Sequence, residues 1–284
     1  YYLPHVADGN FGSVSFRTTF ILFNNTDASV VAILKLTDDT GNPLTVTIGG
    51  LGSGSQFTIN LAAGATSILQ TDGSGSQAVG AATVTATAAI GVSAIFTVYD
   101  ASGNYMTEAG VGNSSPTTEV VLPVDSTGNF LTGLGLFNPG SSDASITMTL
   151  YNTSGSQVDR TTQSLGHGAH RAVFVAAAGQ LFPTVSNFRG TLVVQSSVPI
   201  AALVLRQYQT STQLTYTSLP TVPRSSTKLT LNLAHVANGN YGSISFKTSF
   251  LIFNISASQA NVALVLTKDD GSPFTTTIPG TGTN

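Results

Sequence analysis

No cysteine occurs in the sequence, so neither a disulfide framework nor a metal site built on thiolates is possible. Tryptophan is also absent, and charged residues make up 8% of the 284 positions, against roughly 25% in an average soluble protein. Ten lysines and arginines face thirteen acidic residues, for a net charge of −3. Because the cations are scattered singly, the chain lacks the basic patch that binds nucleic acid or anionic lipid. We expect no nucleic acid among its partners.

Helical signals are missing as well. Nowhere does an apolar stripe with a 3.6-residue period stand between capping residues. One uncharged stretch, GAATVTATAAIGVSAIFTVY from Gly80 to Tyr99, has the length of a membrane span. Gly91 interrupts it, however, and its apolar residues alternate with a period of two. We expect two strands here and no membrane insertion.

Hydroxyl side chains take the place of the missing charges. Forty threonines and 32 serines supply about a quarter of the chain, and 41% of all residues are hydrophobic. That hydrophobic fraction is higher than a disordered tract carries. The composition predicts a packed protein with a weakly charged exterior, long enough for two domains or slightly more.

An internal repeat organises the sequence. Shifted by 230 residues, His5–Gly54 aligns with His235–Asn284 without a gap, and 24 of the 50 positions are identical. A weaker copy is found between them, because Phe23–Gly41 aligns with Phe137–Gly155 at a shift of 114. The chain therefore contains three copies of one first half.

The second halves of the first two copies also correspond. LAAGATSIL from Leu61 resembles LGHGAHRAV from Leu165, and the run from Gly80 resembles the run from Arg189. The repeat predicts unit A at residues 1–114, unit B at 115–224 and the first half of a second A-type unit at 225–284. We call this last segment the half-unit.

Each unit consists of short alternating runs separated by turn residues, a pattern typical of an antiparallel β-sandwich. Glycine and asparagine, which supply positive φ angles, mark a first hairpin turn in every copy. These turns are expected at Ala7–Phe11, Asp125–Phe130 and Ala237–Tyr241. A long strand should follow each turn and end at Asn24, Asn138 or Asn254. The fold class is predicted to be all-β.

The next strand shows which residues should form the core. Ala32, Leu34 and Leu36 are expected to point inward, with Ile33 and Lys35 pointing outward. In the half-unit the equivalent inward residues are Val262, Leu264 and Leu266.

The histidines are the first candidates for chemistry. His5 and His235 occupy one repeat position, and we expect hydrogen-bonded histidines at strand ends. A catalytic or ligand role would need acidic or nucleophilic neighbours that the sequence does not reveal. His167 and His170 are three apart, but Gly168 between them indicates a turn, and an odd spacing on a strand sends the rings to opposite faces. We expect no metal site there.

Acidic pairs are the second candidates. Asp38 and Asp39, and equally Asp269 and Asp270, precede a glycine at a predicted hairpin tip. Calcium prefers six or more oxygen ligands, which one pair does not supply, so turn formation is the favoured interpretation.

Hydrolase motifs are not found. The carboxylate pair of a glycosidase would have to come from sparse aspartates and from Glu108 and Glu119. Neither a G-x-S-x-G elbow nor a phosphate-binding glycine loop occurs. We therefore expect no enzyme, no cofactor, and no catalytic, cofactor-binding or metal-binding residue.

Four asparagines begin an N-x-S/T triplet, which is an acceptor site for glycosylation in exported proteins. They are Asn24, Asn113, Asn152 and Asn254. Such triplets also arise by chance in a chain rich in serine and threonine, and Asn24 and Asn254 are expected to end strands.

FRGTLVVQSSVPIAALVLRQ at Phe188–Gln207, the TSLPTVP that follows, and TGLGLFNPG at Thr132–Gly140 resemble tandem segments of large secreted bacterial surface proteins. Those segments form immunoglobulin-like sandwiches. The resemblance extends over essentially the whole chain, but its motifs are packing and turn motifs. It implies tandem immunoglobulin-like sandwiches in an extracellular setting and transfers no functional residue. Asn24 and Asn254 lack the following proline, so the resemblance is strongest in unit B.

The half-unit raises the question of its missing second half. Left alone it would expose apolar strand faces and unpaired edges. Exchange between copies cannot match three first halves with two second halves. Either the chain belongs to a longer polypeptide, or the half-unit is covered by its twin in a neighbouring molecule or by strands of the adjoining unit.

These features predict an extracellular or cell-surface structural protein. It would be a subunit of a filament or surface layer, built from stacked sandwich units, whose partners are other copies of itself joined by strand or half-unit pairing. One alternative is an adhesin or carbohydrate-binding stalk that binds surface glycans, although the eight tyrosines form no cluster recognisable from sequence. Another is a spacer within a larger secreted enzyme.

Overall fold

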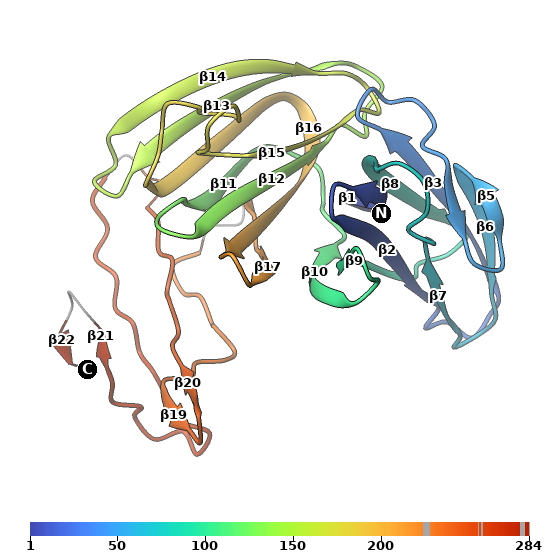
Figure 1. Ribbon diagram of the computed structural model, residues 1–284. Helices are drawn as coiled ribbons and strands as arrows, with labels where there is room; N and C mark the ends of the chain where they lie inside the picture. Colours follow the sequence, from blue (N-terminus) through green and yellow to red (C-terminus); the bar gives the residue numbers. More distant parts are fainter. Residues whose placement is uncertain (224–227, 255, 257, 279–281, 284) are drawn as a thin grey trace. The chain divides into compact units, whose positions relative to one another are not determined.

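The computed structural model describes residues 1–223, 228–254, 256, 258–278 and 282–283, and every regular element among them is a β-strand (Figure 1). The all-β class predicted from the sequence is confirmed. A membrane-spanning helix is not found in any described part of the chain. The chain divides into two compact parts, Tyr1–Ser225 and Ser226–Asn284.

The first ten strands form a sandwich, here called sandwich A. They are β1 (Tyr2–Phe11), β2 (Val14–Phe23), β3 (Val30–Asp38), β4 (Val46–Ile48), β5 (Gly52–Gly54), β6 (Gln56–Leu61), β7 (Thr66–Gln70), β8 (Ala78–Ala86), β9 (Gly91–Asp100) and β10 (Tyr105–Gly112). One layer has the order β1-β8-β3-β6 and the other β7-β2-β9-β10, with antiparallel pairing throughout both layers.

Strand β1 belongs to both layers. Its first part pairs with β8, whereas Gly9–Phe11 pairs with Val14–Phe16 of β2. Gly9 has a φ of 85°, which lets the strand bend between the layers. The tight turn therefore falls at Gly12, whose φ is 59°, and the sequence prediction of a turn at Ala7–Phe11 was wrong by a few residues.

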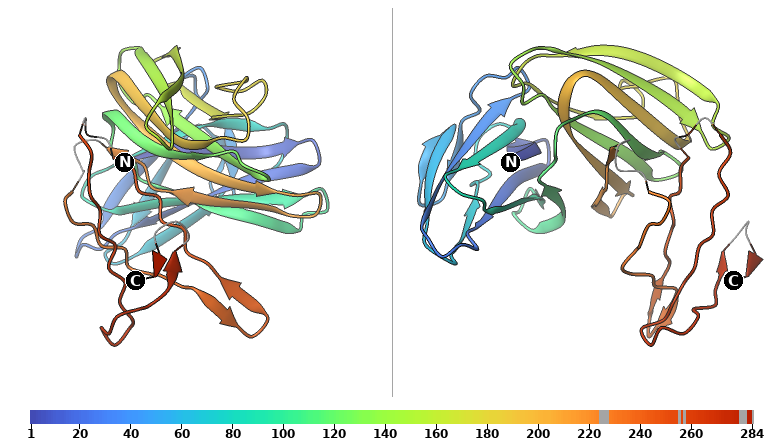
Figure 2. Two further views of the ribbon diagram at one scale, coloured as in Figure 1. Left: turned by 90° about the vertical axis from the view of Figure 1, so that its left-hand side faces the viewer. Right: turned by 180° about the vertical axis from the view of Figure 1, so that it is seen from behind.

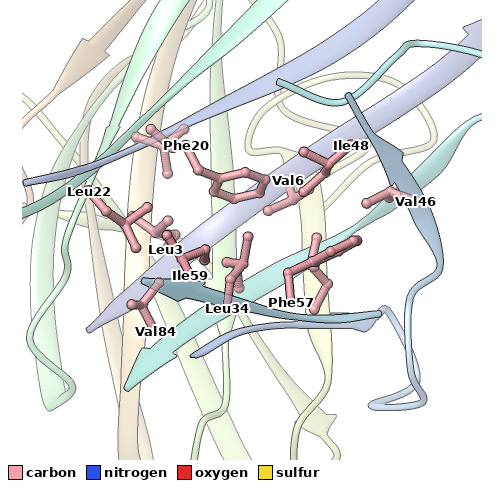
Figure 3. Packing of buried hydrophobic residues seen from close by; sticks show 14 of the residues in the cluster. Leu3, Val6, Phe20, Leu22, Leu34, Val46, Ile48, Phe57, Ile59 and Val84 are labelled. Carbon is pink, nitrogen blue, oxygen red and sulfur yellow. The ribbon is translucent and has the colours of Figure 1, made fainter. Parts of the chain in front are cut away.

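Alternation along the strands builds the core of sandwich A. Ala32, Leu34 and Leu36 of β3 are fully buried while Ile33 is exposed, as the sequence predicts. Figure 3 shows side chains from β1, β2, β3, β4, β6 and β8 pointing into one interior. Burying one leucine of this kind stabilises the fold by roughly 1.5–3 kcal/mol. The stretch that has the length of a membrane span forms β8 and β9, which confirms the strand prediction.

Sandwich B follows with the same arrangement. Its strands are β11 (Thr117–Asp125), β12 (Phe130–Phe137), β13 (Ala144–Asn152), β14 (Gln157–Leu165), β15 (His170–Phe174), β16 (Arg189–Gln209), β17 (Leu214–Leu219) and β18 (Val222–Pro223). One layer has the order β18-β11-β16-β13-β14 and the other β15-β12-β16-β17. A second hydrophobic core fills this sandwich.

The long strand β16 does in sandwich B what two strands do in sandwich A. Its first part pairs with β11 and β13 in one layer, and its last part pairs with β12 and β17 in the other. It is the long curved golden arrow in Figures 1 and 2. In sandwich A the equivalent path is interrupted between β8 and β9. The order of the strands within the two layers is the same in both sandwiches, in line with the sequence repeat, whereas the β1–β2 and β4–β5 pairs are found in sandwich A and the β11–β18 pair in sandwich B.

The segment by which the chain enters each sandwich is hydrogen-bonded to the segment by which it leaves. In sandwich A the Ser114 N–H donates to the Tyr2 carbonyl at 2.9 Å. In sandwich B, β18 pairs with Val120 and Val121 of β11. The connection from A to B is short, because β10 ends at Gly112 and β11 begins at Thr117.

The half-unit keeps the local structure of the repeat. The β19 (Gly239–Tyr241) and β20 (Ile244–Phe246) hairpin has the register of the β1–β2 tip, and β21 (Thr277–Ile278) with β22 (Gly282–Thr283) corresponds to β4 with β5. The Thr248 hydroxyl bonds both backbone groups of Ala237, as Thr18 does with Ala7. Local sequence is therefore sufficient for these turns.

Long-range packing distinguishes the half-unit from sandwich A. Ile252 is 59% exposed, whereas its counterpart Leu22 is 0% exposed. Val262 is also exposed, so the prediction that it points into a core was wrong, while Leu266 is buried. The reason is the partner strands: β8 and β9 bury these positions in sandwich A, and the sequence contains no counterpart of them in the half-unit.

Candidate functional site

Three residues singled out in the sequence meet where sandwiches A and B touch. His5 comes from β1, Asp39 from the turn after β3, and His170 from the start of β15. His170 Nδ1 lies 2.7 Å from Asp39 Oδ1, and His5 Nδ1 lies 3.4 Å from His170 Nε2. We call this contact between the sandwiches the junction. The sequence did not predict that the three side chains lie together.

Protonation at the junction follows from the carboxylate. An ionised Asp39 only accepts hydrogen bonds, so Nδ1 of His170 carries a proton, and in the neutral imidazole Nε2 faces His5 as an acceptor. The His5 Nδ1–H then donates to that nitrogen, over a distance that makes this a weak hydrogen bond. The three groups form one chain of donors and acceptors across the junction.

Burial keeps His5 neutral. Its ring packs edge-on against Phe96, with ring centroids 5.2 Å apart. Burial, and secondarily the neighbouring His170, lower the pKa of His5 to about 3. An imidazole in this environment stays uncharged at neutral pH and serves as a hydrogen-bonding core residue.

Glycines allow the two sandwiches to approach closely. A Cβ atom placed on Gly135 of β12 would lie 3.0 Å from the Pro4 carbonyl oxygen and 3.7 Å from the His5 Cβ. A Cβ on Gly41 would collide with the His167 carbonyl oxygen, and its φ of 87° also favours glycine. Sequence reasoning missed Gly135, although a glycine inside a strand is a signal of close backbone approach.

Further contacts make the junction a packed interface. Phe137 and Ala201 of sandwich B form a small apolar cluster with Ala81 and Tyr2 of sandwich A. The Tyr216 ring lies 5.7 Å from Phe96, and its backbone N–H donates to Thr107 Oγ1 at 2.9 Å. Burial raises the pKa of Tyr216 to about 12, so its hydroxyl stays protonated and donates to Gln207. The junction combines apolar burial with satisfied polar groups.

An Asp–His–His chain resembles part of a catalytic relay, which requires a nucleophile on the outer imidazole. In the described part of the chain, no hydroxyl side chain is hydrogen-bonded to His5 or His170. Residues 1–223, like the rest of the described chain, also contain no cluster of three or more His, Asp or Glu side chains arranged to hold a metal ion. The geometry fits attachment of one sandwich to the other.

Comparisons of the chain with protein-family models, with curated proteins and with solved structures gave no match. The resemblance to tandem segments of secreted bacterial surface proteins therefore stays a prediction.

The remaining candidates have separate, local roles. His167 is exposed and its Nδ1 lies 3.4 Å from Asp143 Oδ1, so His167 and His170 diverge as the turn between them predicts. Asp38 accepts backbone hydrogen bonds from Thr40 and Asn42 within its own turn. Slight burial alone would raise the pKa of Asp38, but these hydrogen bonds outweigh it and lower the pKa below its usual value. The turn prediction holds for Asp38 and was incomplete for Asp39.

In the half-unit, the equivalent residues remain at the surface. His235 and Asp269, the equivalents of His5 and Asp39, are exposed. Asp270, at the repeat position of Thr40, is also exposed and accepts a hydrogen bond from the Ser272 N–H within the turn.

The asparagines of the sequon triplets are mostly structural. Asn24 is buried, and its amide nitrogen donates to the carbonyls of Ala28, Leu61 and Ala62, so it closes the strand end as predicted and cannot carry a glycan in this conformation. Asn138 does the same in sandwich B. The side-chain oxygens of the other three cap turns or chain ends, namely Asn113, Asn152 and Asn254.

A charged cluster in sandwich B was also not predicted from the sequence. Asp125, 10% exposed, lies 3.1 Å from Arg206 and 3.3 Å from Arg189. Burial alone would raise the pKa of Asp125, but hydrogen bonds from Thr127 and Arg206 lower it below its usual value. Arg206 also stacks over Phe130, with 3.5 Å from its Cζ to the ring centre. The cluster ties the end of β11 to both parts of β16 and to Phe130 at the start of β12.

Two open clefts border the junction. One of about 340 Å³ is lined by Tyr2 and by several prolines and serines, and one of about 530 Å³ lies along the exit strands of both sandwiches. No Asp, Glu, His, Lys or Arg lines either of these two clefts. Neither offers groups for acid–base chemistry.

Proposed function

We propose that the protein is an extracellular structural subunit of a filament or surface layer, in which β-sandwich units stack and join copies of the chain. The observation that carries this proposal is the junction. Consecutive sandwiches dock through a buried interface, in which the buried His5 of sandwich A is hydrogen-bonded to His170 of sandwich B.

Composition supports the same proposal. Few charges and many hydroxyls give an exterior with little electrostatic repulsion between copies, which favours close packing of like surfaces. The exposed apolar side chains of the half-unit, among them Ile252 and Val262, offer a surface that another strand or sandwich can cover.

Electron microscopy and sedimentation test the proposal on the full chain. We expect concentration-dependent species larger than a monomer in sedimentation velocity, and rods or sheets in negative stain. Dispersed monomers at the highest soluble concentration would contradict it. A glycan array discriminates the adhesin alternative, because selective binding of one glycan class would favour a binding stalk over a structural subunit.

A further inference from the structure

Two arginines share one carboxylate at the end of sandwich B. Arg189 is the first residue of β16 and Arg206 lies near its last residue. Nη2 of each arginine contacts Asp125 Oδ2, at 3.3 Å for Arg189 and 3.1 Å for Arg206. Residues 1–223 contain six lysines and arginines, and the fold brings these two together. The cluster therefore has two cations for one anion, a surplus of one positive charge.

The same positions in sandwich A are apolar. The strand pairings align Asp125, Arg189 and Arg206 with Ala7, Val79 and Phe96. Those three side chains pack in the hydrophobic core of sandwich A. A buried ion cluster can often be replaced by apolar residues without loss of stability, and sandwich A shows that apolar residues close this end of the fold. The charges of sandwich B therefore point to a role other than stability.

The two guanidinium groups are open to solvent. The Arg189 side chain is 60% exposed and the Arg206 side chain is 35% exposed. In sandwich A, Phe96 stands at the position of Arg206, is only 4% exposed, and has its ring 5.7 Å from that of Tyr216 of sandwich B. Sandwich B thus covers this position in sandwich A, whereas a ligand can reach the arginines of sandwich B.

Most hydrogen-bond donors of the two arginines are unused. Among the described residues, the Arg206 side chain donates only to Asp125, and the Arg189 side chain donates only to Asp125 and Thr127, in each case from Nη2. Nε and Nη1 of both groups are therefore available. The planar set of guanidinium N–H groups matches the two oxygens of a carboxylate. Arg206 also stacks on Phe130, with its Cζ 3.5 Å from the ring centre, which fixes its orientation.

The neighbours of the arginines include uncharged polar groups. Thr127 accepts a hydrogen bond from Arg189, and Asn129 and Gln209 lie at the same end, because the Gln209 N–H donates to the Asn129 carbonyl at 3.0 Å. Asn129 and Gln209 are both exposed. Hydroxyl and amide groups can donate to and accept from sugar hydroxyls. Together with one surplus positive charge, they match a sugar that carries one carboxylate.

We propose that Arg189 and Arg206 bind the carboxylate of a uronic acid in an acidic polysaccharide. Asp125 holds the two guanidinium groups side by side, the free N–H groups of both arginines donate to the ligand carboxylate, and the amides of Asn129 and Gln209 contact the sugar hydroxyls. This site goes beyond the proposed assembly of copies, because its ligand is not the chain itself.

A charged trisaccharide and its neutral ester test the site on the full chain. Trigalacturonate carries a carboxylate on every ring, and its methyl ester keeps the rings and hydroxyls without the charge. In isothermal titration calorimetry we expect the ester to bind at least about tenfold more weakly, because hydrogen bonds between ionised groups are the strong ones. Equal affinities, or no binding up to about 10 mM trigalacturonate, would overturn the proposal.

Arginine variants locate the binding site. Arg189→Gln leaves Arg206 paired with Asp125, and Arg206→Gln leaves Arg189, so thermal unfolding should show that both variants fold. Each should weaken trigalacturonate binding at least about tenfold. Arg160→Gln is the matched control, because Arg160 is an exposed arginine on β14 outside the cluster, and it should keep the wild-type affinity. Wild-type affinity in both cluster variants would overturn the proposal.

Protection of the wild-type protein gives a readout that needs no variant. Phenylglyoxal modifies exposed arginines, and mass spectrometry reports the rate at each one. Saturating trigalacturonate should slow the modification of Arg189 at least about fivefold, which corresponds to an occupancy above about 80%, and should leave the rate at Arg160 unchanged. An unchanged rate at Arg189 would contradict the assignment.

Two further outcomes concern the ligand and the proposed function. A glutamate tripeptide that binds as tightly as trigalacturonate would overturn the sugar assignment and identify an acidic peptide as the ligand. Filament formation is scored separately by microscopy. Trigalacturonate binding by a chain that stays monomeric would contradict the proposed function and leave the arginine site intact.

Discussion

At the scale of single residues, His5 shows how a titratable side chain can serve as a packing residue. It is buried between two sandwiches, donates to one imidazole and contacts one aromatic ring. Docking therefore requires the neutral form of the side chain. This requirement links the stability of the junction to pH.

Acid should weaken the fold of residues 1–223 before most carboxylates titrate. Unfolded His5 takes up a proton near pH 6.5, whereas burial lowers the native pKa to about 3. Between these values the unfolded chain binds more protons, so the free energy of unfolding falls by up to about 1.4 kcal/mol per pH unit as the pH drops. Above about pH 6.5 this residue contributes its full stability and no slope. Urea unfolding from about pH 7.5 to 4.5 measures the dependence.

The His5→Gln variant is the control for this slope, because glutamine keeps a hydrogen-bonding group and does not titrate. We expect its stability to change little over the same range. His235→Gln should retain the wild-type slope, since His235 is exposed in the same repeat position. A flat pH profile for the wild-type protein would show that His5 is not held in the neutral, buried state.

Sequence reasoning reached part of this site. It predicted that His5 is hydrogen-bonded and that Asp38 forms a turn, and both predictions are confirmed. The expected position of His5 at a strand end was wrong, because this residue lies inside β1. Sequence reasoning did not predict the partners, because His5 and His170 are 165 residues apart and meet only after both sandwiches have folded. The alternation of residues in one strand does not determine which outward side chains meet another sandwich.

At the scale of elements, strand β12 is adapted to two neighbours at once. It pairs with β15 and β16 inside sandwich B, and it contacts β1 of sandwich A at Gly135. Its sequence, with glycine at 133 and 135, would be a weak strand in isolation. The tertiary contact explains why a small residue stands at position 135.

Substitutions at the two glycines should have opposite effects. Gly135→Val places side-chain atoms within the space of the Pro4 carbonyl and should destabilise residues 1–223 by about 1–3 kcal/mol. Gly133→Val is the matched control, because the nearest atoms to its Cβ are at 3.7 Å, an ordinary contact. Valine has a higher strand propensity than glycine, so Gly133→Val should leave the stability of sandwich B unchanged or raise it slightly. Thermal unfolding of both variants measures the difference, and equal losses would contradict a close approach at Gly135.

The elements themselves were largely predictable. The alternation of apolar and polar residues predicted β3, β8 and β9, because each of these strands buries one face. The internal repeat predicted the equivalent strands in sandwich B. The first hairpin turn was misplaced because Gly9 was read as a turn residue, whereas it bends β1 between two layers. A positive φ angle can be inferred from glycine, but its role depends on which strands pair on either side.

At the scale of the whole molecule, the half-unit shows that the turns of the repeat form without the packing that buries the core of sandwich A. It forms the turns of sandwich A without the strands that bury the sandwich A core. The repeat predicted that a half-unit left alone would expose apolar strand faces, since only the first half recurs in it, although Val262 was expected to point inward. The burial of each residue depends on strands far away in the sequence.

Two equivalent substitutions test this difference. Leu22→Ala removes a fully buried side chain and should lower the free energy of unfolding of sandwich A by about 2–5 kcal/mol. Ile252→Ala, at the same repeat position, removes an exposed side chain and should change stability by less than about 0.5 kcal/mol. Calorimetry of the full chain compares them. A comparable loss for Ile252→Ala would show that the half-unit is packed in solution.

The hydrogen bond between the entry and the exit of each sandwich has a consequence for a protein under load. Tension along the polypeptide would enter sandwich A at Tyr2 and leave it at Ser114, and these two residues are bound directly to each other. The force would cross that contact without stretching the core. Once the contact opens, β1 would peel from β8 one hydrogen bond at a time, so each sandwich would lengthen from its entrance inward and act as an extensible link.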